Sequence, residues 1–164
     1  MPAARRSEIV FVATYRPATA DADSSAQVGS RDAEMDARVA RHRAERPSAW
    51  RTLEAPAKIA ESVSALSPQA MGVIVDCLTL WISDRLDQDD ASILRDWKNE
   101  LAGLKQLGVP VIVVGNEVGW SLVPADPLMR RFRDLTGLLS QITAAASERA
   151  SLMVAGYEII LKGN

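Results

Sequence analysis

The single histidine of this 164-residue chain, His42, lies in a segment with three arginines, Arg41-His42-Arg43-Ala44-Glu45-Arg46-Pro47. A neutral imidazole is a competent nucleophile near pH 7. Guanidinium groups match phosphate oxygens and stabilise the charge that develops during phosphate transfer. The segment therefore indicates covalent work on phosphate. Two plainer interpretations stay open: a solvated basic helix end, or a buried histidine that is hydrogen-bonded to a backbone carbonyl.

Two further polar groups follow apolar runs. Val73-Ile74-Val75-Asp76 ends in a carboxylate. In phosphate-handling α/β proteins an acid at this place holds Mg²⁺, directly or through water, although many such acids only cap the next helix. Asn116-Glu117-Val118-Gly119 comes directly after another apolar run and combines an amide, a carboxylate and a glycine. Its plainer interpretation is a turn with a solvated glutamate.

The elements that must position these groups follow from the periodicity of apolar residues. Short β-branched runs predict strands at residues 9–14, 72–77 and 110–115, with final strands at 151–155 and 158–162. Helical patterns cover residues 30–47, 58–66, 78–86, 91–107 and 128–149, with Gly108 as a C-cap. Met35, Val39 and His42 share one face, so His42 is expected on the inward side of its last helical turn.

Strands that alternate with helices predict an α/β fold, a mostly parallel sheet with helices on both faces. Ligands bind beyond the carboxyl ends of the strands in such folds. Thr14-Tyr15-Arg16, Asp76 and Asn116-Glu117 should therefore meet at one edge of the sheet.

Composition bounds the class of protein. The chain fits one domain over residues 1–164, with an N-terminal arm at 1–8 and a flexible loop at 16–30. A net charge of −2 argues against a dedicated nucleic-acid or membrane-surface binder. One cysteine, Cys77, fits a reducing cytosol, and no apolar run is long enough to span a membrane.

Five motifs in order closely resemble the bifunctional adenosylcobinamide kinase/adenosylcobinamide-phosphate guanylyltransferase family, from Ile9 to the C-terminus. They are residues 32–54, Val75-Asp76-Cys77-Leu78-Thr79, Asn116-Glu117-Val118-Gly119 with Val123-Pro124, residues 132–137, and the final Val154-Ala155-Gly156 with its short strand.

This resemblance implies a cytoplasmic enzyme of cobalamin assembly. It would phosphorylate adenosylcobinamide with ATP or GTP, then transfer GMP from GTP to adenosylcobinamide-phosphate through a guanylylated histidine, here His42. Asp76 would hold Mg²⁺, and the resemblance suggests a homotrimer. The family's nucleotide contacts fall on Thr14, Tyr15, Arg16, Arg43, Ala44, Glu45, Arg46, Glu54, Leu78, Thr79 and Leu80.

The chain departs from the family in one respect. The family begins with a strand, a Gly-rich phosphate loop that ends in Gly-Lys-Ser, and a helix, whereas these 164 residues contain no Gly-x-x-x-x-Gly-Lys-[Ser/Thr]. The expectation is a P-loop nucleotide-hydrolase-like fold without its first strand, P-loop and first helix. Either the chain starts late or the element is lost. Alternatively, the chain is a truncated or degenerate non-catalytic homologue that binds nucleotide, corrinoid or a partner subunit. A third hypothesis is a generic α/β phosphotransferase outside cobalamin metabolism.

Overall fold

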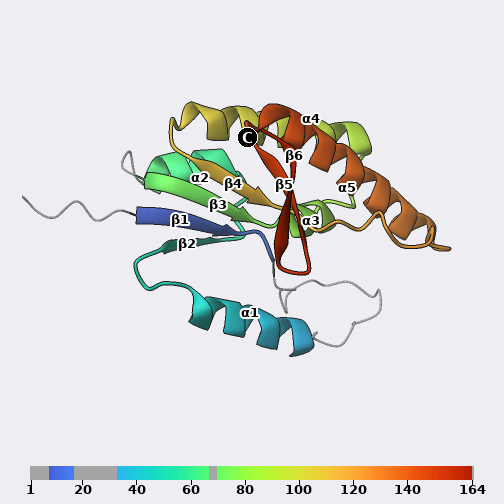
Figure 1. Ribbon diagram of the computed structural model, residues 1–164, viewed down its shortest axis with the longest axis horizontal. Coiled ribbons are helices and arrows are strands. Elements are labelled where there is room, and N and C mark those ends of the chain that lie inside the picture. The colour runs from blue at the N-terminus through green and yellow to red at the C-terminus, as the bar shows by residue number, and fades with distance from the viewer. Residues whose placement is uncertain (1–7, 17–32, 67–69, 164) are drawn as a thin grey trace, which may run out of the picture.

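A four-stranded parallel sheet in the order β2-β1-β3-β4 forms the centre of the molecule (Figure 1). The computed structural model describes residues 8–16, 33–66 and 70–163. The strands of this sheet are β1 (Glu8–Ala13), β2 (Arg51–Glu54), β3 (Ala70–Asp76) and β4 (Val111–Val114). All three pairings are parallel, which confirms the predicted α/β fold.

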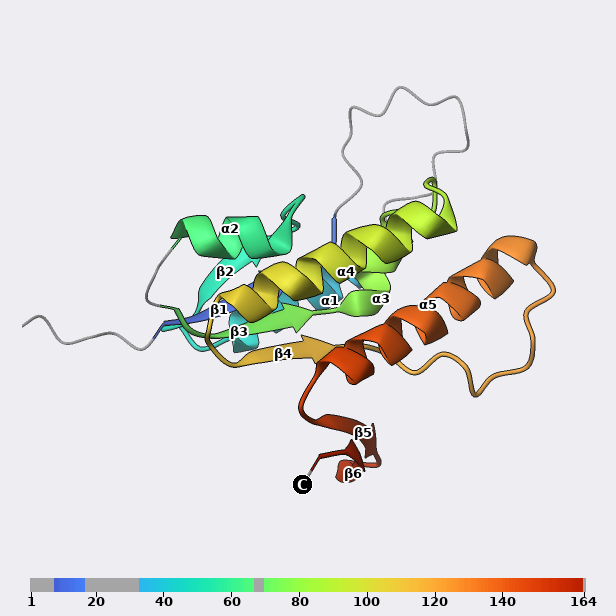
Figure 2. The ribbon, with the colours of Figure 1, turned by 90° about the horizontal axis from the view of Figure 1, so that it is seen from above.

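Helices cover both faces of this sheet. They are α1 (Ala33–Glu45), α2 (Ile59–Leu66), α3 (Leu78–Ser83), α4 (Asp90–Gln106) and α5 (Pro127–Ala146). Helix α1 lies on one face, and α2, α4 and α5 lie on the other (Figures 1 and 2). No helix among the described residues is long and apolar enough to cross a membrane.

Most predicted elements are present, with shifted ends. Helices α3 and α5 end at Ser83 and Ala146 rather than Leu86 and Arg149. Strand β2 was not predicted at all, because Arg51-Thr52-Leu53-Glu54 is short and half polar and becomes a strand only by pairing with β1. The helix cap at Ser30 and most of the arm at 1–8 and the loop at 16–30 lie outside the described residues.

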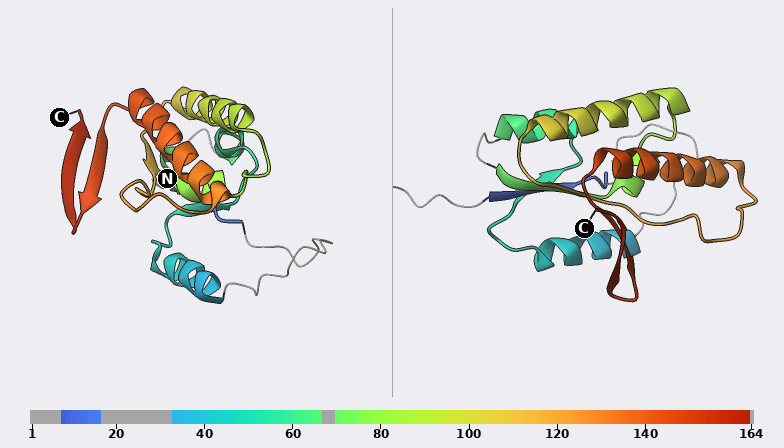
Figure 3. Two further views of the ribbon diagram at one scale, coloured as in Figure 1. Left: turned by 90° about the vertical axis from the view of Figure 1, so that its right-hand side faces the viewer. Right: turned by 45° about the horizontal axis from the view of Figure 1, so that its top comes forward.

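The final hairpin stands apart from the parallel sheet. Strands β5 (Ala150–Val154) and β6 (Tyr157–Lys162) pair antiparallel and form a separate two-stranded sheet. Figure 3 shows this hairpin beside the main body rather than within the central sheet. The final strands are thus confirmed as strands, but they do not extend the parallel sheet.

Alternation along β1 divides its side chains between the two faces of the sheet. Val10 and Val12 are fully buried in the core beneath α2 and α4, with Val73 and Val75 of β3. Trp97 of α4 is also fully buried, and its ring centroid lies 5.0 Å from that of Trp81. The indole N–H of Trp97 donates to Thr143 Oγ1 at 2.8 Å. Phe11 points to the opposite face, where α1 lies.

A carboxylate from α4 caps the start of α2. Glu100 Oε1 accepts from the backbone N–H of Ile59 at 3.0 Å, and Oε2 accepts from that of Ala60 at 2.8 Å. The first amides of a helix lack partners within the helix and carry its positive dipole end, so a carboxylate there is stabilising. The two helices also cross closely, because a Cβ on Gly103 would lie 2.6 Å from Ala60 Cβ.

Replacement of Glu100 by alanine should lower the free energy of unfolding by about 2–4 kcal/mol, since each buried donor left without an acceptor costs about 1–3 kcal/mol. Glu61→Ala is the matched control. Glu61 pairs with Lys58 on the surface, where both side chains are exposed, and such pairs contribute little. Urea denaturation measures both variants, and equal losses would contradict the capping role of Glu100.

Candidate functional site

The carboxyl ends of three neighbouring strands are level with one another. Ala13, the last residue of β1, is in register with Glu54 on one side and with Asp76 on the other. Asp76 is in turn aligned with Val114 of β4. Two predicted carboxylates therefore flank the end of β1, and Thr14-Tyr15-Arg16 leaves the sheet between them.

An open pocket of about 240 Å³ lies at this edge of the sheet, on the α1 face. It is lined by Phe11, His42, Glu45, Arg46, Pro47, Trp50 and Asp76. Phe11 stacks on Trp50 with ring centroids 6.1 Å apart. The nucleophile candidate and the candidate metal-binding carboxylate thus share one pocket.

His42 is exposed rather than packed inward. The interpretation as a buried histidine satisfied by a carbonyl is therefore wrong. Most described side chains of α1 are exposed, so this helix buries little surface against the sheet. His42 nevertheless lines the pocket from the last turn of α1, as a nucleophile that must reach a bound substrate would.

Glu54 joins the end of β2 to two of the arginines beside His42. Its Oε1 lies 3.1 Å from Arg43 Nε and 3.7 Å from Arg46 Nη1. The Arg46 guanidinium also lies 4.0 Å from the centroid of the Phe11 ring. Within the described part of the chain, the buried Arg46 Nε has no hydrogen-bond partner. A donor in this state at the pocket wall is suited to an anionic ligand.

The sequence of the chain is similar to those of known proteins. The sequence model of the family described as "Cobinamide kinase / cobinamide phosphate guanyltransferase" matches residues 3–161. The chain belongs to this family.

Three curated relatives cover most of the chain. The "Bifunctional adenosylcobalamin biosynthesis protein CobP" of Pseudomonas aeruginosa is 42% identical over 142 residues, 85% of this chain and 80% of the relative. The proteins named "Bifunctional adenosylcobalamin biosynthesis protein CobU" from Escherichia coli and Salmonella typhimurium are 32% and 30% identical, each over 80% of both chains.

In this cobinamide kinase/guanyltransferase homologue, several predicted nucleotide contacts have buried side chains. Thr14 and Thr79 are each 5% exposed, and Leu78 is 2% exposed. Thr14 Oγ1 accepts from the backbone N–H of Cys77 and donates to its carbonyl, both at 2.7 Å. The hydroxyl groups of these threonines are buried and bonded within the protein. A nucleotide would therefore meet chiefly backbone groups at these positions.

The loop after β4 is tied to the same place. Asn116 Nδ2 donates to Thr79 Oγ1 at 2.8 Å, and Thr79 Oγ1 lies 3.0 Å from Cys77 Sγ. The exposed Glu117 instead accepts from Gly119 N at 2.6 Å, which is the turn with a solvated glutamate considered from the sequence. Asn116 thus belongs to the strand-end network, and Glu117 closes a local turn.

The remaining predicted contacts are dispersed. Arg16 pairs with Asp84 at 3.3 Å, on the α3 side of the strand ends. Tyr15 and Leu80 are half-buried, and Ala44 is exposed. Phe11 and Trp50 line the pocket but were not predicted as site residues. Phe11 has the pattern of an ordinary strand residue, and Trp50 follows the proline that ends the helix. An aromatic residue placed just after the arginine segment was the available signal.

Arg46→Ala should lower the free energy of unfolding by about 1–2 kcal/mol, because it removes a cation–π contact and a buried aliphatic stem. Only 13% of the Arg46 side chain is exposed. Arg41→Ala, at an exposed position of α1, is the control and should change stability by less than about 0.5 kcal/mol. If urea unfolding gives the same small change for both, Arg46 does not hold α1 to the sheet.

Proposed function

We propose that this chain phosphorylates adenosylcobinamide and transfers GMP from GTP to adenosylcobinamide-phosphate, with His42 as the nucleophile. The observation that carries this proposal is the pocket that His42 shares with Asp76 at the strand ends, beside Arg46. The family membership supplies the reaction class.

The transfer divides into two displacements at the α-phosphorus of GTP. A neutral imidazole nitrogen of His42 attacks this phosphorus, an N–P bond forms, and the P–O bond to pyrophosphate breaks with its electron pair on the leaving oxygen. A phosphate oxygen of adenosylcobinamide-phosphate then attacks the same phosphorus. The N–P bond breaks, its electrons return to the imidazole, and adenosylcobinamide-GDP is released.

The arginines have a defined part in both steps. Guanidinium donors at Arg43 and Arg46 offset charge on the non-bridging phosphate oxygens while bonds are made and broken. The Glu54 carboxylate forms ion pairs with both side chains. We infer that Glu54 keeps these two cations at the end of α1, close to His42, until a phosphate competes for them.

Asp76 fits a magnesium site only in company with a nucleotide. The described residues contain no cluster of three or more His, Cys, Asp or Glu side chains that could hold a metal. Mg²⁺ commonly binds through one or two carboxylates together with substrate phosphates and water. Bound in this way, Mg²⁺ would neutralise charge on the phosphates of GTP or ATP. We propose Asp76 as its protein ligand.

Incubation with GTP labelled at the α-phosphate tests the nucleophile. The label should be acid-labile and base-stable, as expected for a phosphoramidate, and His42→Ala should abolish it while Arg41→Ala retains it. The experiment includes the 164-residue chain and the same chain preceded by a strand, a Gly-Lys-Ser loop and a helix. Labelling should be stronger in the second form, because the amides and lysine of such a loop hold the triphosphate.

Persistent labelling of His42→Ala would overturn the role of His42. Absence of label from both forms would favour the other function considered, a non-catalytic homologue that binds nucleotide, corrinoid or a partner subunit. Labelling with GTP but not with ATP would assign the guanylyl donor, and phosphorylation of adenosylcobinamide with each nucleotide would assign the kinase donor.

We further propose that the protein works in the cytoplasm as a homotrimer. Of the exposed large apolar side chains among the described residues, all but Met71 lie between residues 112 and 161. Monomers rarely expose large contiguous apolar patches. Within residues 8–16, 33–66 and 70–163, no further strand pairs with the outer edge of β4. Unpaired strand edges are sites at which another chain can bind. The exposed apolar side chains and the open edge of β4 support the proposal that subunits meet on this side.

Light scattering coupled to gel filtration should give a mass near three times 17.8 kDa. Leu122→Asp and Leu161→Asp should shift the protein toward monomer, because each places a charge at an apolar side chain that is 92% or 66% exposed. Met71→Asp, at 58% exposure outside that region, is the control and should leave the mass unchanged. A monomeric parent protein would refute the trimer.

A further inference from the structure

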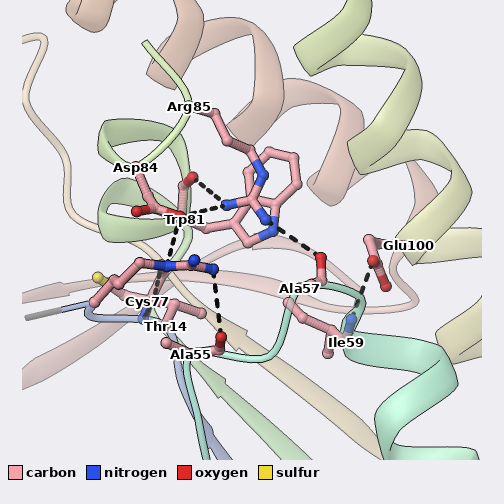
Figure 4. Close-up of polar contacts among 10 residues, drawn as sticks. Thr14, Ala55, Ala57, Ile59, Cys77, Trp81, Asp84, Arg85 and Glu100 are labelled. Atoms are coloured by element: carbon pink, nitrogen blue, oxygen red, sulfur yellow. Dashed lines mark hydrogen bonds and ion pairs between the residues drawn. The ribbon is translucent and has the colours of Figure 1, made fainter. Parts of the chain in front are cut away.

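Three charged side chains form a row that links the end of α3 to the end of β1. Asp84 Oδ2 lies 3.3 Å from Arg16 Nε and 3.5 Å from Arg85 Nη1. The charges therefore alternate along Arg85, Asp84 and Arg16. Figure 4 shows Asp84 and Arg85 beside the segment that follows β2.

Arg85 is the most buried of these three charged residues. Only 12% of its side chain is exposed, and its guanidinium lies 4.1 Å from the centroid of the Trp81 ring. It donates to the carbonyl oxygen of Trp81 at 3.0 Å and to that of Ala57 at 3.4 Å. Burial lowers the pKa of Arg85, the carboxylate of Asp84 opposes this shift, and the charge of Arg16 adds to it.

Arg16 is the more exposed member. Its side chain is 49% exposed, and among the described residues it contacts Asp84 and, at 3.5 Å, the carbonyl oxygen of Ala55. Ala55 follows Glu54 directly and donates its N–H to the carbonyl oxygen of Ala13 at 2.7 Å. Arg16 therefore lies across the junction between the ends of β1 and β2, next to the predicted nucleotide contacts Thr14 and Glu54.

We propose that Asp84 is a positioning residue that holds Arg16 at the ends of β1 and β2, where it can meet a nucleotide phosphate, with Arg85 as its anchor. This inference rests on the proposed guanylyl transfer. Without the carboxylate, Arg16 and Arg85 would face each other as like charges, and the exposed Arg16 would turn toward solvent. A nucleotide phosphate would then have to reorder Arg16 before using it, at a cost in binding rather than in the rate of the bond-making step.

The test uses single-turnover labelling with α-phosphate-labelled GTP on the form of the chain that gives label. Asp84→Asn should raise the half-saturating GTP concentration about tenfold, the equivalent of one charge-assisted contact, and change the maximal rate less than about twofold. Asp84→Glu should restore most of the affinity. Asp87→Asn, an exposed neighbour, is the matched control.

A double-mutant cycle identifies the route of the effect. If Asp84 acts through Arg16, Arg16→Ala with Asp84→Asn should bind GTP no more weakly than Arg16→Ala alone. Two independent, multiplying losses would overturn the proposal, and so would a variant that unfolds at lower urea with unchanged GTP dependence. If the unmodified protein gives no label in either form, the proposed function and this inference both fail.

Discussion

Strands β2, β1 and β3 end at the same level of the sheet, and this register governs both the core and the candidate site. Ala13 lies opposite both Glu54 and Asp76, so the register of two parallel pairings determines where both carboxylates sit. The same register buries Val10 and Val12 completely. A slip of one residue would turn Phe11 into the core and the valines toward α1. The same strand register is consequently needed for the packing of the core and for the geometry of the site.

Polar groups at the strand ends divide into two kinds with different tasks. Thr14 and Thr79 are buried and hydrogen-bonded within the protein, so they fix the positions at which the chain leaves the sheet. His42 and Arg43 are exposed, and Asp76 is half-buried. Buried polar groups need internal partners, whereas groups that exchange bonds with a substrate must keep access to it. The arrangement satisfies both conditions within one edge of the sheet.

The two sides of the molecule differ in how well they are packed. Around Trp97 the helices α2, α4 and α5 enclose a continuous core with the sheet. From β4 onward, apolar side chains such as Ile112 and Tyr157 lie on the surface, and the β5–β6 hairpin forms a sheet of its own. Helix α1 likewise buries little, and Glu54 together with the Arg46–Phe11 contact ties its end to the sheet. The candidate site therefore lies beneath a helix, α1, that has few contacts with the sheet.

Features that depend on residues close together in the chain could be predicted from the sequence. Apolar periodicity located three of the four strands of the sheet and each helix of the described residues, and contiguous motifs around His42, Asp76 and Asn116 indicated the family. Tertiary structure alone decided what depends on which elements become neighbours. Strand β2 exists through pairing with β1, Glu100 caps a helix 40 residues earlier in the chain, and Asp84 reaches Arg16. Such contacts join residues far apart in sequence, so no local pattern encodes them.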